Sequence, residues 1–143
     1  MRIVRSYSRE MARYTIDAPT LLHLVAEDLR FDPSHQLVAP NTIRSQALSL
    51  LFAAVASGEI TEQVALERHR RLTELKMRLL GDRVSRGTAW KLAREHGWSS
   101  TFDAEYIAVC KLQADAFISI DPAMAAMAER VVPLAALADL TST

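Results

Sequence analysis

The sequence predicts an α/β fold, a domain of three layers in which a short, mostly parallel sheet is flanked by helices on both faces. Short and nearly continuous apolar runs, some rich in β-branched residues, alternate with segments of helical spacing along the chain. Strands of a parallel sheet are buried on both faces, so they have this kind of sequence. The chain has 143 residues, half of them hydrophobic, and no net charge, which fits one domain with a substantial core.

The first part of the chain is expected to contain two strands and two helices. Residues 13–16 are predicted to form a short strand, and residues 18–31 form an apolar-faced helix after it. A second strand is expected at residues 36–39. Asn41 is a suitable N-cap for the next helix, which Gly58 is expected to end.

The second part of the chain is expected to contain four helices and two strands. Thr61 is predicted to cap a long helix that Gly81 ends. The other expected elements are, in order, a helix at 87–96, a helix at 102–112, a strand at 117–120, a helix that begins at Asp121-Pro122, and a final strand at 131–134.

The composition indicates one domain and no membrane span. The domain is expected over residues 13–137, after an N-terminal extension at 1–12 that is either a flexible arm or lies upstream of a second start at Met11, and before a C-terminal tail at 138–143. No apolar stretch approaches the roughly 20 residues that cross a bilayer, and the N-terminus lacks the apolar core of a secretory signal. The single cysteine, Cys110, excludes an internal disulfide and is expected in the core. These features favour the cytoplasm.

Positive charge is concentrated between residues 68 and 94. This segment has nine basic residues and two acidic ones, a local excess of seven positive charges. One interpretation is a solvated helix face. The other is an electrostatic surface for phosphates.

Three aspartates end apolar or capped runs that are far apart in the sequence. Asp17 and Asp121 each follow a predicted strand, and Asp103 lies in the first turn of a predicted helix. In α/β proteins, ligands bind beyond the carboxyl ends of the strands. Aspartate is also among the best helix caps, so each residue has a structural explanation. Three converging carboxylates would repel one another without a cation, and Mg²⁺ or Mn²⁺ would reverse that cost.

The order of these segments resembles the PIN domain, and in particular the VapC-type toxins of bacterial type II toxin–antitoxin pairs. The resemblance covers roughly residues 13–134. It rests on Asp17 after a strand, on Pro40 before a helix with Gln46 six positions on, and on two motifs, Asp103-Ala-x-Tyr-x-Ala and Ile118-Ser-Ile-Asp. It implies the PIN-like arrangement of a parallel sheet between helices.

The resemblance also implies a set of site residues. Asp17, Asp103 and Asp121 would be the catalytic residues and the metal ligands, and Ser119 would be a helper hydroxyl. Gln46 stands where the family has a glutamate. It would be a weak fourth ligand for Mg²⁺ or Mn²⁺, since its carbonyl oxygen can bind a cation but adds no charge and cannot accept a proton as a general base.

Two further positions bear on this site. The family often has a small hydroxyl or amide residue where this chain has Pro19, and Thr20 lies one position later. Glu105 follows Asp103 by two residues and is expected to point to another side of its helix. It is therefore a poor replacement for the missing carboxylate.

The family's activity implies a metal-dependent endoribonuclease toxin that hydrolyses RNA phosphodiester bonds in the cytoplasm. Its partners would be a cognate antitoxin, an RNA substrate and a second copy of the chain, bound through apolar Leu/Ala-rich helices. Two alternatives stay open: a catalytically weakened PIN-fold protein that acts as an RNA-binding or antitoxin-binding module, and an unrelated interaction domain with three capping aspartates. The candidates for guiding RNA are Arg68, Arg71, Arg78, Arg83 and Arg86.

Overall fold

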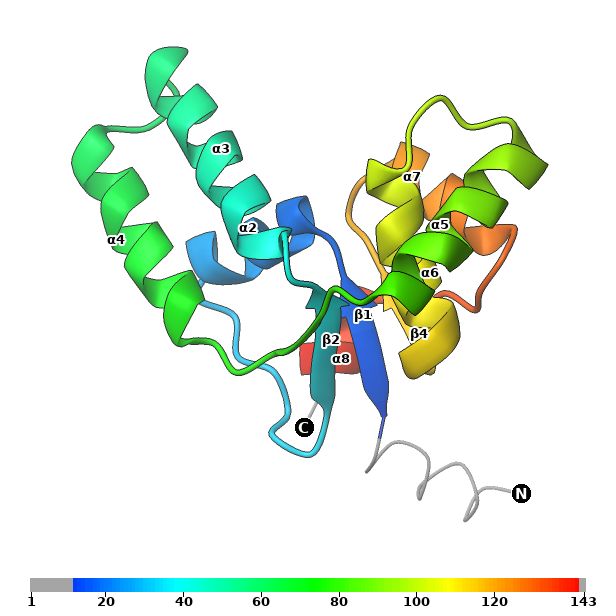
Figure 1. Cartoon of the computed structure of the whole chain (residues 1–143). Helices are drawn as coiled ribbons and strands as arrows, with labels where there is room; N and C mark the ends of the chain where they lie inside the picture. Colours follow the sequence, from blue (N-terminus) through cyan, green and yellow to red (C-terminus); the bar gives the residue numbers. More distant parts are fainter. Residues whose placement is uncertain (1–11, 142–143) are drawn as a thin grey trace.

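The structure, a computed structural model, describes residues 12–141, where seven helices surround a four-stranded parallel sheet (Figure 1). The expectations for a flexible arm and a start at Met11 therefore lie outside the described residues. The three-layer α/β class that the sequence predicts is confirmed. The strands are β1 (Arg13–Ile16), β2 (Gln36–Pro40), β3 (Arg78–Leu80) and β4 (Ala116–Ile118). The helices are α2 (Ala18–Ala26), α3 (Ile43–Ala56), α4 (Glu62–Glu74), α5 (Arg83–His96), α6 (Phe102–Gln113), α7 (Pro122–Glu129) and α8 (Leu137–Thr141).

The sheet has the strand order β3-β2-β1-β4, with every neighbouring pair parallel. In the register of β1, Thr15 lies opposite Val38 of β2 and Phe117 of β4. All three side chains are fully buried. Because the strands are parallel, their carboxyl ends meet at one edge. The residues that directly follow the strands there are Asp17, Asn41, Gly81 and Ser119.

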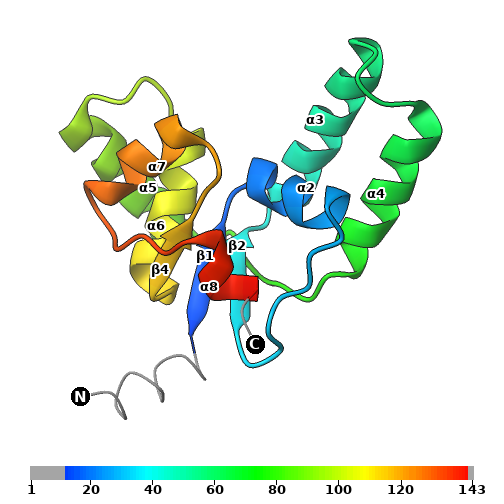
Figure 2. The ribbon, with the colours of Figure 1, turned by 180° about the vertical axis from the view of Figure 1, so that it is seen from behind.

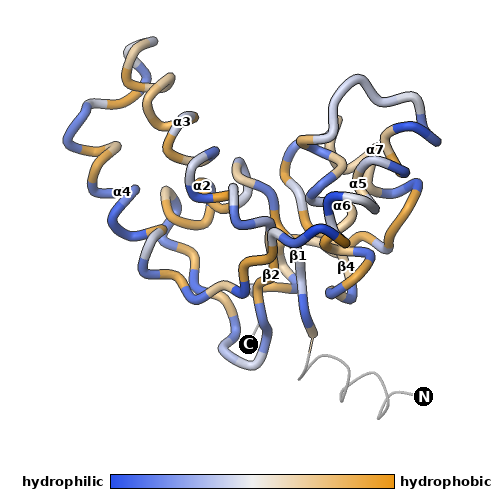
Figure 3. The backbone as a smooth tube through the Cα atoms, viewed as in Figure 1, coloured by the Kyte–Doolittle hydropathy of each residue, from blue (hydrophilic) through white to orange (hydrophobic). Residues whose placement is uncertain are grey.

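Helices cover both faces of this sheet. Helix α6 packs across β2, β1 and β4, with α5 against it, on the side that faces the viewer in Figure 1. Figure 2 shows the reverse side, where α8 lies in front of β1 and β2. Helices α2, α3 and α4 pack together beside the sheet. Figure 3 shows hydrophobic residues concentrated where these elements meet the strands.

Helix α6 is buried along most of its length, from Ala104 to Cys110 apart from Glu105. A helix that is apolar around most of its circumference belongs in an interior. Cys110 is fully buried, as expected, and burial raises the pKa of its thiol to about 12, so it is not a nucleophile near neutral pH. Within residues 12–141, no helix has both the length and the apolar composition to cross a bilayer.

The long helix predicted from Thr61 to Gly81 is wrong. Thr61 does cap α4, accepting a hydrogen bond from the Val64 amide at 3.2 Å. The helix then ends at Glu74, and Arg78–Leu80 pair with β2 as the edge strand β3. Residues 75–80 have a helix-compatible sequence, so their pairing with β2 decides their conformation. The sequence of residues 75–80 alone does not show that β2 has a free edge with which this segment can pair.

Other predicted boundaries also differ. The first helix ends at Ala26 instead of residue 31, and Asp28 adopts a left-handed φ of 51°. Helix α5 begins at Arg83 instead of residue 87, because the Asp82 carboxylate accepts a hydrogen bond from the Ser85 amide at 2.8 Å. Thr42, not Asn41, precedes α3 as its N-cap residue.

The C-terminal region differs from its prediction as well. The strand expected at 131–134 is reduced to a single bridge between Leu134 and Phe117. Residues 137–141, most of which were expected in a tail, form α8. Leu140 is fully buried, and its carbonyl oxygen accepts a hydrogen bond from the Asp32 amide at 3.0 Å. This contact joins α8 to the segment that enters β2.

We expect Leu140→Ala to lower the free energy of unfolding by about 2–5 kcal/mol, because it removes a fully buried side chain and leaves a cavity. Urea unfolding followed by circular dichroism measures this loss. Leu66→Ala is the matched control, since Leu66 lies on α4 with 58% of its surface exposed, and its effect should stay within about 0.5 kcal/mol. Equal effects of the two variants would contradict the packing of α8 on the domain.

Candidate active site

Asp17 is a buried carboxylate at the carboxyl end of β1, with 4% of its surface exposed. It is the N-cap of α2, as its position predicts. One carboxylate oxygen accepts hydrogen bonds from the Thr20 amide at 3.2 Å and the Thr20 hydroxyl at 2.5 Å. The other accepts from the Ser119 hydroxyl at 2.6 Å. All of these donors are neutral, so they fix the carboxylate without cancelling its charge.

The segment after β4 is connected to α2 by the same hydroxyl groups. The Ser119 oxygen accepts a hydrogen bond from the Asp121 amide at 3.0 Å. The Thr20 oxygen accepts one from the Ile120 amide at 3.0 Å. Asp121 caps α7 by accepting from the Ala123 amide at 3.0 Å. The sequence alone did not determine the role of Thr20. Its hydrogen bonds show that Thr20 connects the end of β1 to the segment after β4.

Asp103 differs from the other two aspartates because its carboxylate is not a helix cap. Thr101 is the N-cap residue of α6, and Asp103 lies exposed in the first turn. Partial burial of its carboxyl group raises the pKa of Asp103, and the negative charges of Asp17 and Asp121 raise it further. The negative charges of Asp17 and Asp121 therefore act on the Asp103 carboxyl group. Within residues 12–141, no basic side chain forms an ion pair with any of them.

Gln46 belongs to the same cluster through Tyr106. The Tyr106 hydroxyl donates a hydrogen bond to the Gln46 side-chain oxygen. Burial raises the pKa of Tyr106, and the nearby charges of Asp17 and Asp103 raise it further, so the phenol stays protonated and remains a donor. This bond was not foreseen. The sequence spacing could have placed Tyr106 near the site, since it lies three residues after Asp103 on α6 and such residues share a helix face.

The donor set of this cluster is made of carboxylate, amide and hydroxyl oxygens, which suit a hard cation such as Mg²⁺. In the part of the chain that the structure describes, no three His, Cys, Asp or Glu side chains are grouped so that they could hold one ion together. Mg²⁺ usually binds through one or two carboxylates and keeps several water ligands. The residues present fit a hydrated ion of that kind and do not form a closed cage of protein ligands.

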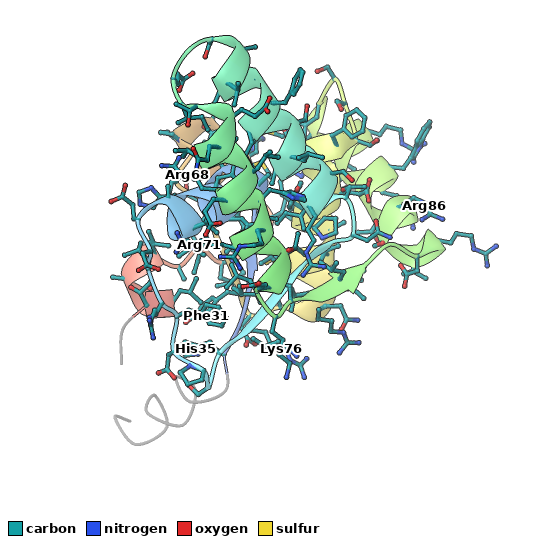
Figure 4. The ribbon with its side chains drawn as sticks, turned by 90° about the vertical axis from the view of Figure 1, so that its left-hand side faces the viewer. Phe31, His35, Arg68, Arg71, Lys76 and Arg86 are labelled. Carbon is teal, nitrogen blue, oxygen red and sulfur yellow. The ribbon has the colours of Figure 1, made fainter. Side chains whose placement is uncertain are left out.

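The five arginines proposed to guide RNA do not form one surface. Figure 4 shows Arg68 and Arg71 on α4, with Arg86 well apart on α5. Arg71 pairs with Asp28 at 2.5 Å, and Arg86 donates to the Gly81 carbonyl oxygen at 2.6 Å.

Arg78 and Arg83 lie at opposite edges of the sheet. Arg78 begins β3 and lines a cavity of about 700 Å³ together with Arg13 and Lys76. This cavity is at the amino edge, away from the aspartates, since Arg13, Gln36 and Arg78 are the first residues of their strands. Arg83 begins α5, which follows the carboxyl end of β3. Arg83 and Arg86 are therefore the two candidates that share an edge with Asp17.

Comparison with known proteins supports the fold and gives no family. No model of a known protein family matches the chain, and no curated protein matches it. Among solved structures, the chain is similar to PAE2754 from Pyrobaculum aerophilum, with a TM-score of 0.64 and 16% sequence identity. The match covers 87% of this chain and 92% of that one. At this identity the likeness shows a shared fold only.

We expect Asp103→Asn to stabilise the protein at neutral pH by a few tenths of a kcal/mol, since it removes repulsion at an exposed and screened position. The pKa of Asp103 is higher in the folded than in the unfolded state. Folding therefore favours the protonated form, and the wild type loses stability as pH rises through the folded pKa. The gain from Asp103→Asn should shrink toward about pH 4. Urea unfolding at both pH values tests this.

Glu95→Gln removes an exposed carboxylate from α5 and is the control for that experiment. Its effect should not grow between acid and neutral pH as that of Asp103→Asn does. The same pH dependence in both variants would contradict the interaction among the three aspartates.

We expect Ser119→Ala to lower the free energy of unfolding by about 1.5–3 kcal/mol, because the buried Asp17 carboxylate loses a donor. The loop amide of Asp121 loses its acceptor in the same variant. Ser119→Thr keeps the hydroxyl and should retain most of the stability. Thermal and urea unfolding measure both variants, and a Ser119→Ala protein as stable as wild type would show that these contacts are weak.

Proposed function

We propose that this protein is a metal-dependent endoribonuclease that hydrolyses RNA phosphodiester bonds, as the VapC-type toxins that its sequence resembles do. The observation that supports the proposal most is the gathering of Asp17, Asp103 and Asp121 at one edge of the sheet without basic partners in the described part of the chain. Repulsion of this kind is costly in a purely structural cluster, and a divalent cation would relieve it.

The proposed roles follow from the local contacts. A bound Mg²⁺ or Mn²⁺ would polarise the phosphate and lower the pKa of an attacking water. Asp17 would hold the ion from a fixed position, since Thr20 and Ser119 restrain both of its oxygens. Asp103 is exposed and would face the entering substrate. Asp121 supplies the third negative charge.

The proposed substrate approach uses the two RNA-guiding candidates that share the carboxyl edge of the sheet with Asp17. Helix α5 packs against α6, which carries Asp103. Arg83 lies in the first turn of α5, and Arg86 follows it by three residues. Cations at this place would attract the phosphates on either side of the bond to be cut. Arg68 and Arg71 lie on α4 and would contact only more distant parts of an RNA.

The proposed setting is the cytoplasm, with a cognate antitoxin and a second copy of the chain as partners. Support for a protein partner comes from α3, where Ile43, Ala47 and Leu51 are buried. The exposed side of this apolar helix carries Leu48, Leu50 and Phe52, the last with 77% of its surface accessible. Uncovered apolar surface of this kind is typical of an interaction site.

Cleavage of a structured RNA with Mn²⁺ tests the enzyme proposal. We expect Asp103→Asn to lower the rate by more than about a hundredfold, since even residues that only support metal ligands change activity by 10–100-fold. Gln46→Glu should raise it by about tenfold, because one more carboxylate charge near a cation is worth roughly 1 kcal/mol or more. Glu105→Gln, the same charge change two residues from Asp103, is the matched control and should stay close to wild type.

Two outcomes would count against these assignments. If Asp103→Asn cuts as well as wild type, the site is assigned incorrectly. If Mn²⁺ also leaves the melting temperature of wild type unchanged, the three aspartates are structural residues only.

The second candidate function is a catalytically weakened PIN-fold protein that binds RNA or an antitoxin. One observation favours it: Gln46 is neutral, and its side-chain oxygen already accepts the Tyr106 hydroxyl. A ligand at this position would have to compete with that hydrogen bond. An inert wild type together with an active Gln46→Glu variant would support this candidate and overturn the enzyme proposal for the natural protein.

A further inference from the structure

The connection between α5 and α6 brings two tryptophans to one place (yellow-green loop in Figure 1). Trp90, Ala93 and Arg94 are spaced three and four residues apart on α5 and share a face. Gly97 ends the helix with a left-handed φ of 69°, and the Trp98 amide donates back to the Ala93 carbonyl oxygen at 2.9 Å. This turn, a Schellman-type ending, returns Trp98 to the same face.

These residues line a cavity of about 460 Å³, which we name the tryptophan cavity. Its walls are Trp90, Ala93, Arg94, Trp98 and the three hydroxyl-bearing residues 99–101. The two indole rings differ in solvent exposure. Trp98 is partly buried, packs on the core and stacks on His96 with ring centroids 4.8 Å apart. Trp90 is 63% exposed, so one of its ring faces can receive a ligand.

The chemistry of the cavity matches a nucleobase. An exposed indole stacks on the flat face of any base. The hydroxyls of Ser99 and Thr101 can donate to and accept from the polar edge of a base. Arg94 is exposed and has no ion pair within residues 12–141, so it is available to a phosphate.

The tryptophan cavity also lies beside the candidate active site. Thr101 belongs to its wall and precedes Asp103 by two residues, a stretch of chain that spans at most about 7 Å. The Ser100 hydroxyl accepts a hydrogen bond from the Phe102 amide at 3.1 Å, which holds the turn between them. A base in the cavity would therefore belong to a nucleotide close to the phosphate that Asp103 faces.

We propose that the tryptophan cavity is a nucleobase-binding subsite for single-stranded RNA, with Trp90 as the stacking platform and Arg94 as a phosphate contact. The inference rests on the proposed function, because it assigns the substrate of that nuclease to a specific surface. It gives Trp90 a role in base selection near the cleaved bond, because bases that stack more strongly on its indole ring would bind more tightly. Purines, which offer the larger face, would be preferred.

Binding of a short, fluorescently labelled oligoadenylate to the full chain in EDTA tests this inference without cleavage. We expect Trp90→Ala to weaken binding by about tenfold to a hundredfold, which corresponds to the loss of one stacked base. Trp90→Phe keeps an aromatic face and should recover most of the affinity. Leu66→Ala, which removes an exposed apolar side chain from α4, is the control and should leave binding unchanged.

An oligonucleotide with abasic positions separates stacking from phosphate contacts. It should bind wild type and Trp90→Ala equally weakly, because it offers no base to stack. Arg94→Gln should reduce the dependence of affinity on salt, since one phosphate contact is lost. Oligouridylate should bind wild type more weakly than oligoadenylate, and Trp90→Ala should reduce that difference. Equal affinity of Trp90→Ala and wild type for oligoadenylate would overturn the inference.

The cleavage assay keeps this inference distinct from the proposed function. Cleavage with Mn²⁺ that is unchanged in KM and in base preference by Trp90→Ala would overturn the subsite and leave the nuclease in place. Trp90-dependent RNA binding without cleavage would support the subsite and overturn the nuclease. Absence of both binding and cleavage would overturn both the subsite and the nuclease.

Discussion

The parallel pairing of β1 with β2 on one side and β4 on the other is the constraint on which the rest of the structure depends. It places the residues after β1 and β4 at the same edge, where Asp17 accepts a hydrogen bond from Ser119. Thr20 then joins α2 to the segment after β4 through the Ile120 amide. A shift of β4 by one residue would exchange the faces of Phe117 and Ile118 and break this connection.

The sequence predicted well those helices that begin with a capping residue and a proline. It predicted poorly the segments whose conformation depends on pairing with a strand distant in the sequence. Asp17 and Asp121 begin helices, and proline follows each within two residues, so the first residues of α2 and α7 could be placed closely. Residues 78–80 have no strand signal of their own and become β3 only because β2 offers an edge. The bridge of Leu134 to Phe117 likewise depends on a neighbour distant in the sequence.

The candidate site could be predicted in part: its aspartates were identified from the sequence, and the contacts that depend on how helices cross were not. The residues themselves placed Asp17 and Asp121 after strands and Asp103 in the first turn of a helix, and the family resemblance joined the three into one site. The effect of Asp17 and Asp121 on the pKa of Asp103 is compatible with that grouping. The bond from Tyr106 to Gln46 joins α6 to α3 and depends on how these helices cross. No local sequence pattern in α3 or α6 predicts the angle at which the two helices cross. The tryptophan cavity likewise depends on the turn at Gly97, which helix periodicity does not describe.

The neutral donors around Asp17 have a consequence for the whole molecule. Hydroxyl and amide groups hold the Asp17 carboxylate in place without adding positive charge, and its field acts on the Asp103 carboxyl group. The chain has no net charge, and residues 68–94 contain nine of its basic residues against two acidic ones. The carboxyl edge of the sheet therefore carries charge of both signs, because Arg83 and Arg86 of α5 share it with Asp17. A polyanion that approaches this edge would meet attraction and repulsion side by side, and added salt would weaken both.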